Sequence, residues 1–185
     1  MHSVESLITA RYFMFSQVYY HPQRQAYDHH LKDYLFHEVL DEKPFPCDLA
    51  FHQAHTDTSV WGRLLTSGSK WARPILERKA FKEICRLLPG QMGVTDSLSE
   101  QAYQAACARY GAEQVRRSRN KSTSVGPFPV LRRRRDDIIS SHGMSPLLEK
   151  PPPTGVHYVF VHPDQHKDAV DWFIKTCEEK KGNPD

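Results

Sequence analysis

Apolar residues at the start of the chain recur at the spacing of an α-helix. This pattern predicts an amphipathic helix that runs to about Tyr20, where His21 and Pro22 interrupt it. Proline suits the first turn of a new helix, and the helical period continues beyond it, so a second helix is expected to about Leu40. The apolar stripe of the first helix consists of Val4, Leu7, Ile8, Phe15 and Val18.

The rest of the chain divides into further helices and then short strands. Helices are expected at about Thr58 to Leu65, Ala72 to Leu88 and Ser97 to Tyr110. Short strands are expected at Gln114 to Ser118, at Phe128 to Arg132 and, most clearly, at His157 to Val161, before a closing helix. The pattern changes after Pro89 and Gly90. The sequence therefore predicts a mainly α-helical N-terminal part (1–90) followed by a small α+β C-terminal domain (91–185).

Composition narrows the class of protein. In 185 residues, 25 Lys and Arg stand against 22 Asp and Glu, and a net charge of +3 does not by itself indicate a nucleic-acid partner. No apolar run is long enough to span a membrane, and the N-terminus lacks the pattern of a signal peptide, so we expect a cytoplasmic protein. The four cysteines form no CxxC pair, which favours reduced thiols over a disulfide framework or a zinc site.

Arg11 is the first residue that indicates chemistry, because helical spacing places it within the apolar stripe. A guanidinium there needs an anionic partner, either a carboxylate or a bound phosphate. Tyr19 follows two helical turns later, about 12 Å along the same face, which is a span comparable to a nucleotide. Two interpretations stay open. In the first, Arg11 forms a structural ion pair, Tyr19 is a core residue and His21 ends the helix. In the second, these residues belong to a ligand site.

The segment from Glu5 to His21 resembles a helix of HD-domain phosphohydrolases of the deoxynucleoside triphosphate triphosphohydrolase (dGTPase-like) family. The distinctive pattern is A-R-Y-x-M followed by Q-V-Y-x-H. The resemblance extends to Asp57 to Trp61, Leu76 to Phe81, Phe128 to Leu131 and Tyr158 to Val161.

The resemblance implies site residues and a reaction. The arginine matching Arg11 would reach the substrate phosphates, the tyrosine matching Tyr19 would lie against the deoxyribose, and the histidine matching His21 would lie near the same pocket. Pro22 departs from the family, which can have a basic residue there. The complete enzyme would use a divalent metal such as Mn²⁺ or Mg²⁺ to convert a deoxynucleoside triphosphate into deoxynucleoside and triphosphate.

The family's metal-binding HD motif belongs upstream of this helix, so the resemblance concerns the C-terminal half. We therefore expect a truncated or split enzyme, inactive alone, whose partner is the missing HD half or a second copy. His29, Asp33 and His37 share one helix face, but one stripe supplies only one side of a coordination sphere. Neither that stripe nor His52 with His55 is expected to bind metal, and we assign no catalytic residue.

Two basic groups offer an alternative function. Arg116, Arg117 and Arg119 belong to the first group, and Arg132 and Arg133 belong to a run of four arginines. If both groups flank paired strands, they gather on one edge and bind nucleic acid or a nucleotide effector. The alternative is therefore a non-catalytic module that binds nucleic acid or protein through a basic edge. Trp61, Trp71 and Phe81 are expected to be packing residues.

Overall fold

The computed structural model describes residues 2–88, 96–121, 126–132, 137–142, 144–151 and 153–182. Its helices, in chain order, are α1 (His2–Phe13), the π-helix η1 (Met14–Tyr19), α2 (Pro22–Tyr34), the π-helix η2 (Leu35–Val39), α3 (Leu49–Ala54), α4 (Asp57–Thr66), α5 (Arg73–Leu76), α6 (Asp96–Tyr110), the 3₁₀ turn η3 (Ala112–Gln114), α7 (Pro146–Glu149), the 3₁₀ turn η4 (Pro163–Gln165) and α8 (His166–Gly182). The strands are β1 (Lys82–Leu87), β2 (Val115–Asn120), β3 (Pro129–Arg132), β4 (Asp137–Ser140) and β5 (Val156–Val161). The fold class is as expected: a mainly helical N-terminal part precedes an α+β part.

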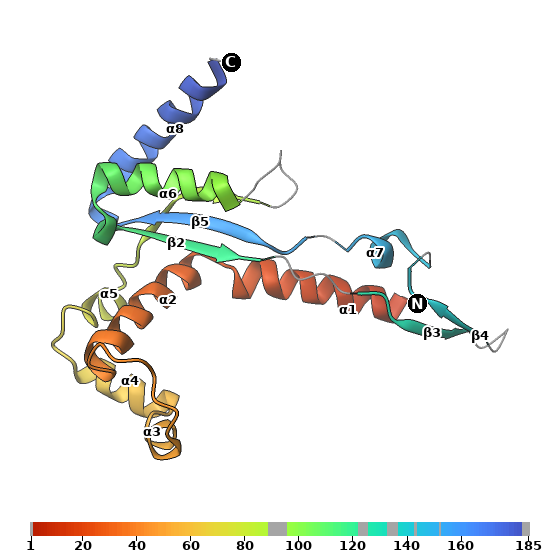
Figure 1. Cartoon of the computed structure of the whole chain (residues 1–185), viewed down its shortest axis with the longest axis horizontal. Coiled ribbons are helices and arrows are strands. Elements are labelled where there is room, and N and C mark those ends of the chain that lie inside the picture. Colours follow the sequence, from red (N-terminus) through yellow and green to blue (C-terminus); the bar gives the residue numbers. More distant parts are fainter. Residues whose placement is uncertain are drawn as a thin grey trace.

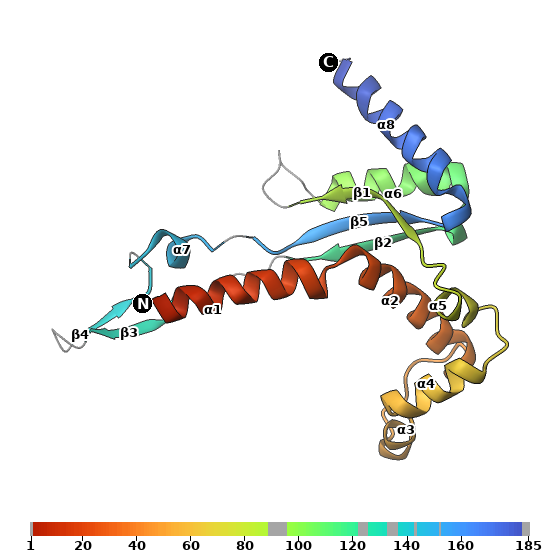
Figure 2. The same cartoon turned by 180° about the vertical axis from the view of Figure 1, so that it is seen from behind.

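The central sheet is antiparallel and has the order β1, β5, β2. Helices α6 and α8 cover one of its faces, and α2 packs on the other (Figures 1 and 2). Because successive side chains of a strand point to opposite faces, Tyr158 and Phe160 of β5 pack toward α2, whereas Val159 and Val161 pack toward α6 and α8. Burial on both faces explains why β5 reads as an almost continuous apolar run.

A third cluster joins the end of α2 to the helices that follow. Tyr34, Leu64 and Ala72 are buried there. This cluster positions α4 and α5 beside α2, at the end of α2 that lies away from α1 (Figure 1). A separate hairpin of β3 and β4 lies near the start of α1 (Figure 2).

One expected helix is wrong. The segment from Ala72 to Leu88 contains only the short helix α5 and then strand β1. Arg78 has a positive φ of 57°, which a continuing α-helix does not permit, and β1 pairs with β5 far along the chain. The central sheet thus includes β1, which precedes residue 90. The division of the chain into two parts near residue 90 stays a prediction.

The first helix also differs from expectation. It changes from α to π geometry at Met14, and only Ile8 of the expected stripe is buried. Leu7 and Val18 are exposed. Within the described ranges, no helix combines the length and apolar character needed to cross a bilayer.

Candidate functional site

Arg11 and Tyr19 are connected through the ring of Phe15. The guanidinium carbon of Arg11 lies 4.4 Å from the Phe15 ring centroid. The centroids of Phe15 and Tyr19 are 5.3 Å apart in an edge-to-face arrangement. Arg11, Phe15 and Tyr19 therefore form a continuous row along α1 and η1, which we call the Arg11 row.

The Arg11 row continues to Arg24 of α2. The Arg24 guanidinium lies 5.9 Å from the Tyr19 ring centroid and also donates to the carbonyl oxygen of Tyr19. Gln25 donates to the same oxygen at 2.9 Å. Because the last carbonyls of a helix have no partner within the helix, these two side chains satisfy the end of η1 and fix the bend before α2.

His21 stands at that bend and caps α2. Its Nδ1 accepts a hydrogen bond of 3.3 Å from the backbone N–H of Gln23. The His21 ring is exposed, and its Nε2 has no hydrogen-bond partner among the described residues. The structure thus gives His21 a structural role and leaves one ring nitrogen for a ligand.

The Arg11 row is open to solvent on one side. Tyr19 is 41% exposed, and apolar Phe13, Met14 and Val18 beside it are each about half exposed. Soluble domains rarely leave a contiguous apolar strip of this kind uncovered. A cationic and aromatic row bordered by apolar side chains can bind a ligand with both anionic and ring-shaped parts.

One face of the second expected helix carries His29, Asp33 and His37, which we did not expect to bind metal. Their side chains contact three different partners. His29 Nε2 is 2.9 Å from the hydroxyl of Ser118, Asp33 pairs with Arg116 at 3.0 Å, and His37 Nδ1 is 2.9 Å from a carboxylate oxygen of Glu42. In the part of the chain that the structure describes, no group of three or more His, Cys, Asp or Glu side chains is arranged to bind a metal ion.

Two adjacent histidines fasten α2 to the sheet. His30 Nε2 accepts from the backbone N–H of Phe81, and the two rings stack with centroids 4.4 Å apart. Burial lowers the pKa of both His29 and His30 to about 4. Both rings are therefore neutral near pH 7 and serve the packing of α2.

The arginines of β2 do not form one basic edge. Arg116 points to the α2 side, where it pairs with Asp33, whereas Arg117 pairs with Glu100 of α6 on the opposite side. Arg119 is exposed. Strands β2 and β3 also belong to different sheets, so the condition for a shared edge is not met. Arg132 ends β3, and Arg133 lies outside the described residues.

The packing role expected for three aromatic residues holds for two of them. Phe81 is buried, and Trp71 stacks on His37 with ring centroids 4.0 Å apart. Trp61 is instead 54% exposed and lines a pocket between α2 and α4. Its position in an amphipathic helix gave no signal that this face would stay uncovered.

Comparison with known proteins gives a similar fold but no family. No protein-family model matches the sequence, and no curated protein matches it significantly. The chain is similar to the crystal structure of a hypothetical protein from Aquifex aeolicus, with a TM-score of 0.75 and 20% sequence identity over 92% of this chain. The match covers 44% of that protein. At this identity the similarity establishes the fold alone.

Proposed function

We propose that the chain is the substrate-pocket and accessory C-terminal half of a dNTP triphosphohydrolase-like HD phosphohydrolase. The complete enzyme would cleave a deoxynucleoside triphosphate into deoxynucleoside and triphosphate. The observation that carries the proposal is the Arg11 row, because it puts a guanidinium and a tyrosine ring at the two ends of one phenylalanine. This order suits a ligand that has phosphates at one end and a sugar at the other.

Each residue of the row has a defined part in this proposal. Arg11 binds phosphate charge, since a planar guanidinium offers two parallel donors to phosphate oxygens. Tyr19 presents its ring to the deoxyribose, and its hydroxyl has no hydrogen-bond partner among the described residues. His21 holds the bend and directs Nε2 to the same ligand.

The proposed partner is the HD half or a second copy of the chain. Two observations support a partner that covers α1 and η1. Leu7, Phe13, Met14 and Val18 are exposed there, and the Aquifex protein extends well beyond the matched region. The proposal includes a cytoplasmic location, the compartment to which the deoxynucleotide substrate belongs.

The implied divalent metal does not fit the described residues. The described residues that come nearest to a set of metal ligands are His29 and Asp33. His29 contacts Ser118, and Asp33 pairs with Arg116. When bound in the complete enzyme, such a metal would activate water and stabilise phosphate charge. We derive no step through it, and this chain contributes substrate binding and orientation.

Ligand mapping by NMR tests the proposal on the chain itself. Three probes separate the parts of the substrate: dGTP, inorganic tripolyphosphate and deoxyguanosine. We expect weak, millimolar binding, with tripolyphosphate shifting signals around Arg11, deoxyguanosine those around Tyr19, and dGTP both. Shifts that avoid residues 11–24 for all three probes, or no shifts at millimolar concentrations, would contradict the proposal.

A further inference from the structure

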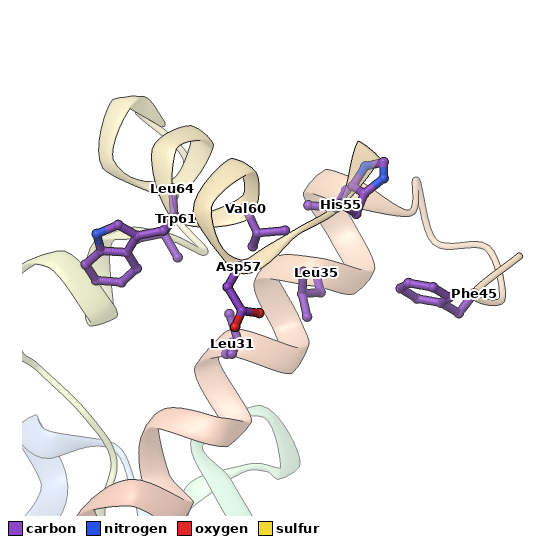
Figure 3. A pocket seen from close by; sticks show the side chains of 9 residues that line it. Leu31, Leu35, Phe45, His55, Asp57, Val60, Trp61 and Leu64 are labelled. Carbon is purple, nitrogen blue, oxygen red and sulfur yellow. The ribbon is translucent and has the colours of Figure 1, made fainter. Parts of the chain in front are cut away.

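An apolar pocket of about 430 Å³ lies where α2 and η2 face α4 (Figure 3). Helix α4 lies at the end of α2 away from α1 (Figure 1). This volume falls within the range of small-molecule sites, which are mostly apolar with a few placed polar groups. Most of its wall is apolar and consists of Leu31, Leu35, Val39, Phe45, Val60, Trp61 and Leu64. Leu31, Leu35 and Val60 lie around Asp57 in Figure 3, with Trp61 on one side and Phe45 on the other.

Among the described residues, two titratable side chains line this pocket, His55 and Asp57, and that of His55 is fully engaged. His55 Nδ1 is 2.8 Å from the carbonyl oxygen of Phe51, so Nδ1 carries the proton and donates it. His55 Nε2 is then an acceptor, and Arg63 donates to it at 3.2 Å. Both ring nitrogens of His55 are therefore engaged, and neither is left for a ligand.

Asp57 is the remaining polar group. Its carboxylate points toward Leu31 and the apolar wall in Figure 3. No ion pair or side-chain hydrogen bond joins it to another described residue. Asp57 is also the first residue of α4, and it is exposed to solvent. The pocket thus combines an apolar wall with one unpaired negative charge.

We propose that this pocket binds a small organic amine whose ammonium group pairs with Asp57 and whose apolar body fills the space against Leu31, Leu35 and Val60. An anionic ligand would be repelled by the carboxylate. A neutral apolar ligand would remove water from that carboxylate and leave it without a partner, which is costly.

The proposal does not depend on the proposed function, because the pocket shares no residue with the Arg11 row. Three ligands of equal length test the charge requirement on the unaltered chain: 4-phenylbutylamine, 4-phenylbutanol and 4-phenylbutyrate. The readout is the indole N–H signal of Trp61, assigned by its loss in Trp61→Phe. We expect the amine to shift this signal and to bind at least about tenfold more tightly than the alcohol and the carboxylate.

Two variants locate the charge. Asp57→Asn keeps the shape of the side chain, and we expect it to lower the affinity for the amine about tenfold while leaving the affinity for the alcohol unchanged. Asp171→Asn makes the same charge change on the exposed surface of α8 and should leave both affinities unchanged. Equal binding of amine and alcohol, an unshifted Trp61 signal, or equal losses in the two variants would overturn the proposal. Circular dichroism checks that each variant is folded.

Discussion

Arg116 of β2 reaches Asp33 of α2 at 3.0 Å, although the two residues are 83 positions apart in the sequence. The Arg116 guanidinium also lies 4.9 Å from the ring centroid of Phe81, the ring on which His30 stacks. Both side chains of the ion pair are about three-quarters buried. An arginine that the sequence assigned to a basic edge therefore holds a helix against a sheet.

Replacing Arg116 by glutamine should lower stability without changing nucleic-acid binding. We expect the free energy of unfolding to fall by about 1 to 2 kcal/mol, because a partly buried carboxylate loses its partner. Urea unfolding measures this loss, and Arg119→Gln on the exposed side of the same strand is the control. If Arg116→Gln instead weakened single-stranded DNA binding at unchanged stability, the basic-edge alternative would regain support.

Acid should weaken the packing of α2 on the sheet. The pKa values of His29 and His30 fall from 6.5 to about 4, chiefly because of burial, so between these values the unfolded chain binds more protons than the folded one. The free energy of unfolding is then fully retained above about pH 6.5 and decreases toward pH 4, by about 2 to 4 kcal/mol for the pair. Urea unfolding at pH 7 and pH 4.5 measures the difference.

A matched pair of histidine variants identifies the source of that pH dependence. His29→Gln keeps a donor for Ser118 but cannot titrate, and it should reduce the slope. His52→Gln, on the exposed surface of α3, should leave the slope unchanged. Equal stability of the unaltered chain at both pH values would show that the two histidines do not act in this way.

The exposed apolar side chains of α1 and η1 should cause self-association. Leu7 is 69% exposed and Val18 is 57% exposed, so replacing both by glutamate removes apolar surface at little cost to the fold. Sedimentation velocity should show larger species for the unaltered chain and a monomer for the double variant. Ile174→Glu, at a position of α8 that is 52% exposed, is the control. A monodisperse monomer before any substitution would refute the expectation.

The proposed function predicts that the chain alone does not hydrolyse dNTPs with Mn²⁺ or Mg²⁺, because the HD half would supply the metal ligands. The assay measures release of phosphate or triphosphate against a heat-treated control. Release that EDTA abolishes and that persists through further purification would show that the chain is an enzyme by itself.

Much of the fold follows from local patterns. Strand β5 is identifiable because both of its faces are apolar, and α4 and α6 lie close to the helices expected at Thr58 to Leu65 and Ser97 to Tyr110. Strand β1 was missed because Ile84, Cys85 and Leu87 fit a helix as well as a strand over so short a segment. The pairing of this segment with β5 selects the strand over the helix, and the two paired strands lie far apart in the sequence.

The candidate site was only partly predictable for a similar reason. The spacing of Arg11, Phe15 and Tyr19 predicted a shared helix face, but the change to a π-helix at Met14 has no clear sequence signal. Arg24 was missed because its contact with Tyr19 depends on the bend at His21. The pocket at Asp57 depends on how α4 packs against α2, which periodicity does not specify.

The role of Arg11 as a phosphate ligand is the central claim, and Arg11→Lys tests it most directly. Lysine keeps the charge but loses the planar fork, so binding of dGTP should weaken by about 1 to 3 kcal/mol while the melting temperature changes little. Arg73→Lys makes the same change at an exposed arginine of α5 and should leave dGTP binding unchanged. The measurement is dGTP affinity by NMR titration, with the melting temperature of each variant recorded beside it. A large fall in melting temperature with unchanged dGTP affinity would show that Arg11 is a structural residue and would contradict the account.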